Sequence, residues 1–155
     1  MFFLLTMTIN IFAQYDLTIR VNGLENKKGH IILDLFESET GYPMKTQNAV
    51  LRKKVAIPAD GPPVIHITGL RSGIYAVALI HDVNDNNLLD LNFLGIPKEG
   101  AGASNDARGF MSPPAWKDAK FTLQKSMMMD VKMDYFYRFG WLFFWCNIEK
   151  IYDKK

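Results

Sequence analysis

Apolar and polar residues alternate with a period of two along much of the chain between residues 15 and 135. In the first run, YDLTIRVN, the apolar positions are Leu17, Ile19 and Val21, and a second run, GHIILDLF at 29–36, repeats the pattern. Side chains alternate between the two faces of a strand, so both runs predict strands with one buried face. The segment LENKKG between them supplies turn residues, which favours an antiparallel hairpin.

Five more strands are predicted downstream, at residues 49–57, 64–68, 74–80, 119–123 and 127–135. The segment PADGPP separates the first two, and GLRSG forms a turn before the third. The third is apolar on both faces, which is typical of a central strand covered on both sides. One face of the last strand carries Met127, Met129, Val131 and Met133. Flexible methionines in this arrangement are core residues rather than ligands.

Seven short strands with regular turn signals and no convincing amphipathic helix predict an all-β fold. We expect a single antiparallel β-sandwich at residues 15–135, of immunoglobulin-like or prealbumin-like architecture. The 155 residues, of which 48% are hydrophobic, suffice for one such domain. One long loop is predicted at residues 91–118, which are rich in Gly and Pro and lack sustained periodicity. Loops longer than about 12–15 residues are uncommon and often functional.

The two ends of the chain depart from this pattern. Residues 1–14 form an apolar run that reaches Ala13 and resembles the end of a signal peptide, although no positive charge precedes it. A buried first strand is the alternative; the signal predicts a periplasmic, outer-surface or secreted protein. Residues 136–155 form an aromatic extension, whose apolar core at 140–148 is shorter than the ~20 residues of a spanning helix. This extension suits an interfacial segment or one that packs on the sandwich.

Charge and cysteine content exclude several classes of function. The formal net charge is only +2, and most basic residues are scattered, so nothing predicts a nucleic-acid partner. Arg52, Lys53 and Lys54 are consecutive, and we expect them on an edge strand, where Lys discourages edge-to-edge pairing. Cys146 is the only cysteine, which excludes an intramolecular disulfide and a cysteine-based zinc site.

The densest chemistry follows the predicted central strand, in HDVNDNNLLD at 81–90. Oxygen-bearing side chains stand at every second or fourth position, at Asp82, Asn84, Asn86 and Asp90. This spacing suits calcium, but an EF-hand needs Glu at the twelfth position, where Phe93 stands, and prefers Gly at the sixth, where Asn87 stands. A looser calcium loop stays open, with Glu99 or Asp106 as the missing ligand. The alternative is a turn whose side chains cap backbone amides.

Other polar residues form a second set of candidates. A sugar or peptide ligand would be held by polar groups at the strand end and on the long loop, namely His81, Lys98, Glu99, Asn105 and Arg108. His81 is the best single candidate for a general base. A zinc site is disfavoured, because a hairpin closed by GLRSG would pair His66 with Val77 and keep it away from His81.

Residues 69–109 read GLRSGIYAVALIHDVNDNNLLDLNFLGIPKEGAGASNDARG. This segment, with PPAWKDA after it, resembles an uncharacterised family of exported bacterial proteins, domain of unknown function 2141. The resemblance runs from about Tyr15 to Asp134. It implies a β-sandwich in an exported protein with no established activity, and it does not extend to the residues after Tyr135.

These observations favour a non-enzymatic module of the cell envelope. Its loops at 82–90 and 93–116 would form a binding or structural surface for an envelope, glycan or peptide ligand, with calcium ordering the first loop. One alternative is a hydrolase or carbohydrate-active accessory domain that uses His81, Asp82 and Glu99 in an open pocket. Another is membrane association through residues 139–145.

Overall fold

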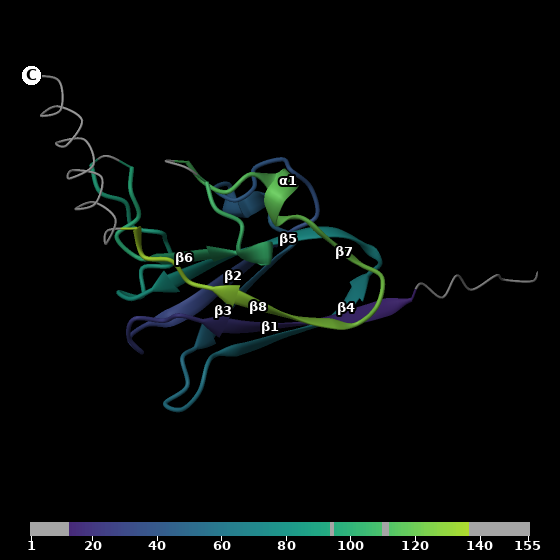
Figure 1. The fold of residues 1–155 in the computed structure, drawn as a ribbon, viewed down its shortest axis with the longest axis horizontal. Coiled ribbons are helices and arrows are strands. Elements are labelled where there is room, and N and C mark those ends of the chain that lie inside the picture. Colours follow the sequence, from purple (N-terminus) through teal and green to yellow (C-terminus); the bar gives the residue numbers. More distant parts are fainter. Residues whose placement is uncertain (1–12, 94, 110–111, 137–155) are drawn as a thin grey trace, which may run out of the picture.

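The computed structural model describes residues 13–93, 95–109 and 112–136, and these residues form an all-β, sandwich-like fold (Figure 1). The first sheet has the order β4-β1-β8, with bounds Val64–Arg71, Gln14–Asn22 and Met127–Lys132. The second has the order β3-β2-β5-β6, with bounds Leu51–Ala56, His30–Phe36, Gly73–Asp82 and Gly100–Ala103. The short β7 also pairs with β5, and its bounds are Phe121–Leu123. The short helical turns η1, η2 and α1 lie at Thr46–Asn48, Ser104–Asp106 and Trp116–Ala119.

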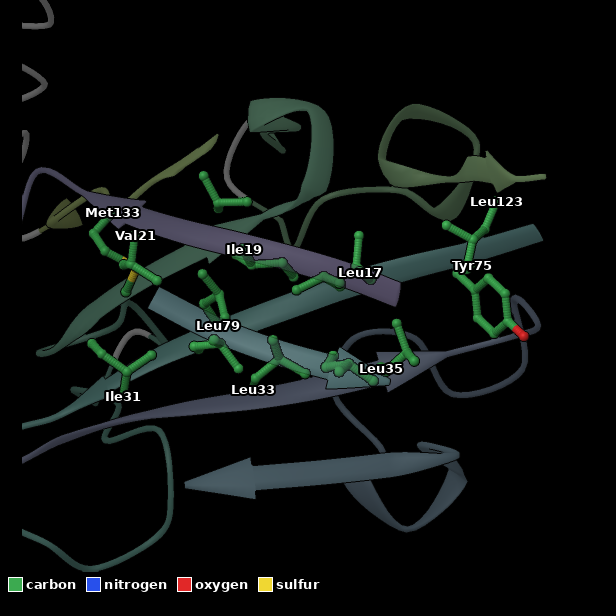
Figure 2. Packing of buried hydrophobic residues seen from close by; sticks show 14 of the residues in the cluster. Leu17, Ile19, Val21, Ile31, Leu33, Leu35, Tyr75, Leu79, Leu123 and Met133 are labelled. Carbon is green, nitrogen blue, oxygen red and sulfur yellow. The ribbon is translucent and has the colours of Figure 1, made fainter. Parts of the chain in front are cut away.

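The predicted apolar faces form one core between the two sheets. Figure 2 shows side chains of β1 and β2 meeting in this space, among them Leu17, Ile19 and Leu33, which are all fully buried. Burying one such side chain stabilises the fold by roughly 1.5–3 kcal/mol. The methionine-bearing face of β8 also contacts this core, and Met133 is almost fully buried. The prediction that these methionines are core residues is therefore confirmed.

The predicted hairpin between the first two strands is wrong. β1 pairs with β4 and β8, whereas β2 pairs with β3 and β5, so residues 23–29 cross from one sheet to the other. Alternation specifies which face of a strand is buried. The buried faces of β1 and β2 line the same core, so alternation does not reveal which strand each of them pairs with. The crossing ends at Gly29, whose φ is 69° and which lies directly against the backbone of Asp82.

The GLRSG turn also connects the two sheets instead of closing a hairpin. β4 pairs with β1, so His66 lies opposite Thr18 and not opposite Val77 as expected. His66 is on the exposed face of the first sheet, and His81 is buried in the second, so the two histidines still belong to different parts of the fold. Among the pairs between described strands, β1 and β8 alone run parallel, which the predicted antiparallel sandwich did not include.

The segment at 91–118 is not one uninterrupted loop, because it contains β6, η2 and α1. β6 has the sequence GAGA, which has no alternation to reveal a strand. The small residues are needed because β8 crosses close by: a Cβ on Gly102 would lie 3.0 Å from the carbonyl oxygen of Lys132. Ala101 and Asp134 exchange two backbone hydrogen bonds of 3.0 and 2.8 Å, which join the two sheets at this end.

The basic triplet lies where it was predicted. Arg52, Lys53 and Lys54 are exposed on β3, an edge strand of the second sheet. The expectations for the signal segment and the aromatic extension fall on residues 1–12 and 137–155, outside the described residues; Gln14 is the first residue of β1. No helix in the described part of the chain is long and apolar enough to cross a membrane.

Candidate functional site

The Asp/Asn loop begins where β5 ends, at Asp82. The carboxylate of Asp82 is fully buried and accepts the amides of Asn86 at 3.1 Å and Asn87 at 2.9 Å. These bonds fold the chain back tightly, and Asp85 and Asn87 adopt the left-handed conformation with φ of 61° and 63°. Asp and Asn tolerate this conformation better than most residues, so the loop forms without a glycine at position 87.

Three of the four predicted calcium ligands converge in this loop. The side-chain amides of Asn84 and Asn86 donate to the two carboxylate oxygens of Asp90, at 2.7 and 2.9 Å. The amide oxygens of the same two residues accept the backbone N–H groups of Asn86 and Leu88, at 3.2 and 2.8 Å. The loop thus has the self-capped geometry of an Asx-rich turn. It also brings together several oxygens of the kind that calcium binds. Each of these oxygens keeps a further lone pair that a cation could use.

Glu99 returns from the long loop and joins both ends of the Asp/Asn loop. Its side chain is 5% exposed, and its two oxygens accept the amides of Val83 at 2.9 Å and Asp90 at 3.2 Å. Asp106, the other residue considered as a missing ligand, accepts the amide of Lys132 on β8 instead. The Glu99 carboxylate therefore helps to hold the two loops together as one unit.

Basic side chains attach this unit to the edge strand. Lys54 donates to the Asn87 side chain at 2.9 Å and lies 3.1 Å from Asp85 and 3.6 Å from Asp82. Arg52 donates to the backbone oxygen of Asn87 at 2.9 Å. The bond from His30, and then that from Lys54, holds the pKa of Asp85 below its usual value. Within the described ranges, no three His, Cys, Asp or Glu side chains are placed to hold a metal ion.

His81, the candidate general base, is completely buried beside Asp82. Its Nε2 lies 2.8 Å from the carbonyl oxygen of Lys28, which can only accept, so Nε2 carries the proton. In the neutral ring Nδ1 then accepts the hydroxyl of Tyr135 at 2.6 Å. Both nitrogens are engaged with the protein itself, and neither faces solvent.

The remaining candidate ligand residues do not gather around His81 and Glu99. Lys98 is exposed, and its backbone amide donates to Asp90 at 2.8 Å. The Asn105 side chain donates to three backbone oxygens around the end of α1, at 3.0–3.3 Å. Arg108 forms two bonds with Asp134, at 2.8 and 3.0 Å. These contacts serve the internal structure of the long segment.

Asp34 is a buried carboxyl that the sequence reasoning missed. It is 2% exposed on the face of the second sheet that points away from the core, and its Oδ1 has no hydrogen-bond partner among the described residues. Burial raises its pKa, and the nearby guanidinium of Arg52, at 3.6 Å, partly opposes this effect. The sequence contains an indication that Asp34 is buried, because this residue interrupts the otherwise apolar run HIILDLF.

On the same face of the second sheet, an aromatic cluster covers the other end of β5. Tyr42 makes edge contacts with Phe36 and Trp116, with centroid distances of 5.3 and 5.6 Å. The cluster packs against Ala76 and Ala103. Tyr42 and Trp116 therefore contribute to a second, small hydrophobic core.

Comparison with known proteins identifies a family but no characterised relative. No curated protein and no solved structure matches the chain. The model of a family described as uncharacterised proteins conserved in bacteria matches residues 19–130, which begin within β1, end within β8 and include the two joined loops. The chain therefore belongs to this family, domain of unknown function 2141.

Proposed function

We propose that this chain is an exported, non-enzymatic module of the cell envelope, whose joined loops at 82–90 and 91–99 form a binding or structural surface ordered by calcium. The observation that carries the proposal is the position of Glu99. Its carboxylate joins both ends of the Asp/Asn loop, so that a ligand bound to one loop also acts on the other.

The donor set of the loop fits a hard cation. Asp90 supplies a carboxylate, Asn84 and Asn86 supply amide oxygens beside it, and Asp82 lies at the base of the loop. Calcium takes six to eight such oxygens in a flexible arrangement. Rotation of the two amide side chains would turn their oxygens toward Asp90, and the bound ion would replace the present bonds among the three side chains.

The burial of the candidate catalytic residues supports a non-enzymatic role over a hydrolase. His81, Asp82 and Glu99 are at most 5% exposed, and each is bonded to the chain's own backbone. A general base must reach the proton that it removes. The depression lined by Glu37, Ser38 and residues 71–75 lies at the opposite end of β5 and contains none of the three.

A calcium titration followed by melting temperature tests the proposal. A ligand that binds only the folded protein stabilises it by ~2.7 kcal/mol at 100 times its dissociation constant. We expect calcium to raise the melting temperature of the wild type but not of the Asp82→Ala, Asp90→Ala double variant. The matched control is Asp60→Ala with Asp118→Ala, which removes the same charge from exposed positions.

A wild-type melting temperature that does not change at millimolar calcium would contradict the calcium assignment. An equal shift in both double variants would place the ion elsewhere on the protein. The binding role is tested separately, by screening glycans and peptides against the wild type and against Lys98→Ala. Turnover of a glycoside or peptide substrate that is lost in His81→Gln would favour the hydrolase instead.

A further inference from the structure

Three large apolar side chains of the joined loops are exposed to solvent. Residues 91–93 and 95–97 fold back on each other as a small hairpin, held by backbone bonds of 2.8 Å between Asn92 and Ile96 and 3.0 Å between Gly95 and Asn92. The apolar side chains on and beside this hairpin are exposed: Phe93 by 95%, Leu88 by 65% and Leu91 by 41%. We call these three residues the apolar tip. Exposed apolar patches of this kind mark docking surfaces.

The C-terminal extension starts at the same end of the molecule. Asp134 is hydrogen-bonded to Ala101 in β6, and Tyr135 is bonded to His81 at the end of β5. Figure 1 shows the described C-terminal end, in yellow, beside the segment that follows β5. Pro97, at the base of the hairpin, precedes Ala101 by four positions and lies at most about 14 Å from it.

The composition of the extension complements the apolar tip. Residues 139–148 read FGWLFFWCNI and contain no charged residue, while Arg138 and Glu149 stand on either side. Trp141 is the seventh residue after Asp134, which gives a reach of up to about 25 Å, so the tip lies within range. A tether of this length gives an effective concentration on the order of millimolar, which favours association within the chain over binding of a separate partner.

We propose that residues 139–148 of this chain dock on the apolar tip and cover Phe93, Leu91 and Leu88. This inference does not depend on calcium or on the proposed role in the envelope.

Disulfide trapping in the full-length chain tests the contact directly, because Cys146 is the only cysteine. In Leu91→Cys, mild oxidation should give an intramolecular disulfide with Cys146, found by mass spectrometry of the digested monomer. The matched control is Ile74→Cys, which replaces a 50% exposed side chain at the opposite end of β5. Equal disulfide yields in the two variants would overturn the proposal.

Tryptophan quenching supplies a second measurement without a new cysteine. In a Trp116→Phe background, all emission comes from Trp141 and Trp145. We expect iodide to quench this emission weakly, and more strongly when Phe93→Ser is added. Met128→Ser, which removes another exposed apolar side chain, should have no effect on quenching. Circular dichroism of each variant establishes that it is folded.

Three outcomes of this measurement would overturn the docking proposal. One is quenching that is strong in the background protein and unchanged by Phe93→Ser. Another is protection that appears only on addition of phosphatidylcholine and phosphatidylglycerol vesicles, which would make a lipid surface the occupant. The last is protection that increases with protein concentration, which would make a second copy of the chain the occupant.

Discussion

At the scale of single residues, the polar side chains buried at the end of β5 bind the protein's own backbone. Asp82 caps two loop amides, Glu99 caps two more, and His81 accepts the Tyr135 hydroxyl while donating to a carbonyl. A sharply folded loop leaves N–H groups without strand partners, and these groups need acceptors when they are buried. Residue types that are typical of catalysis therefore stabilise a turn here.

The Glu99→Gln variant tests the role of this carboxylate. The side-chain amide keeps one acceptor but places an NH2 group against a backbone N–H of Val83 or Asp90. Leaving such a buried donor unsatisfied costs about 1–3 kcal/mol. Urea unfolding in the presence of a chelator should show this loss, and Glu39→Gln, an exposed position, should unfold as the wild type does. If the two variants were equally stable, the two bonds of the Glu99 carboxylate would not contribute to the stability of the fold.

The buried Asp34 makes a prediction about pH. Because burial raises its pKa, the folded protein holds the Asp34 proton more tightly than the unfolded chain does. The stability that this provides is complete below about pH 3.9, the pKa of an unfolded Asp, and is lost as the pH rises through the raised value. The wild type should therefore lose stability relative to Asp34→Asn across this window.

Urea unfolding of both proteins at a series of pH values measures that difference. The lowered pKa values of Asp85 and Asp130 make the protein less stable as the pH falls, but both proteins share this effect and it cancels. A stability difference that does not vary between about pH 4 and pH 7 would show that Asp34 titrates as it does in the unfolded chain.

At the scale of elements, the connections between strands decide how the sheets assemble. Three links in the first half of the chain fall into two kinds. Residues 23–29 and the turn at Ser72 change sheets, whereas the loop from β2 to β3 stays within the second sheet. Lys53 ties the sheets together at one edge, since its ammonium group donates to the carbonyl oxygen of His66 on β4 at 2.7 Å. Edge strands are protected in this way as well as by charge.

Gly29 tests how tightly the first crossing fits. Its φ of 69° already disfavours a side chain, and a Cβ there would lie 1.9 Å from the backbone oxygen of Asp82. Gly61 has a similar φ of 75° but open space around it. Gly61→Ala should cost only the backbone strain, about 1–2 kcal/mol. Gly29→Ala should cost clearly more in thermal unfolding, and equal melting temperatures for the two variants would contradict this account.

The positions of most strands could be predicted from the sequence, whereas their pairing partners could not. The buried faces of β1, β2 and β8 follow from alternation, because side-chain direction is a local property of the backbone. The partners of these strands depend on contacts between distant segments, such as β1 with β8, which no local pattern encodes. β6 escaped notice because Gly102 is selected by the close approach of β8, and the strand itself leaves no alternation.

The candidate site shows the same division. The spacing of Asp82, Asn84, Asn86 and Asp90 correctly placed a tight polar loop after a central strand. Glu99 reaches the Asp/Asn loop because the long segment folds back toward it. The sequence suggested Glu99 or Asp106 for this position and did not distinguish between them. The burial of His81 was not predictable, since it follows from packing against Tyr135, far along the chain.

At the scale of the whole molecule, each sheet is organised around a strand with neighbours on both sides. β1 lies between β4 and β8, so the first and last described strands of the fold are adjacent. β5 lies between β2 and β6 and also pairs with β7. The parallel pairing of β1 with β8 forms late in synthesis, because β8 comes last in the chain among the described strands.

This arrangement predicts the pattern of amide hydrogen exchange. The amides along β1 and β5 point alternately to the strands on either side, so none of the central ones lies on an open sheet edge. We expect their protection to approach the free energy of global unfolding, roughly 5–15 kcal/mol for a domain. Amides of the edge strands β3 and β4 should exchange through smaller, local openings. Exchange measured by mass spectrometry is compared with urea unfolding of the same protein. If the amides of β1 exchanged as fast as those of β4, the parallel pairing of β1 with β8 would not be part of the stable fold.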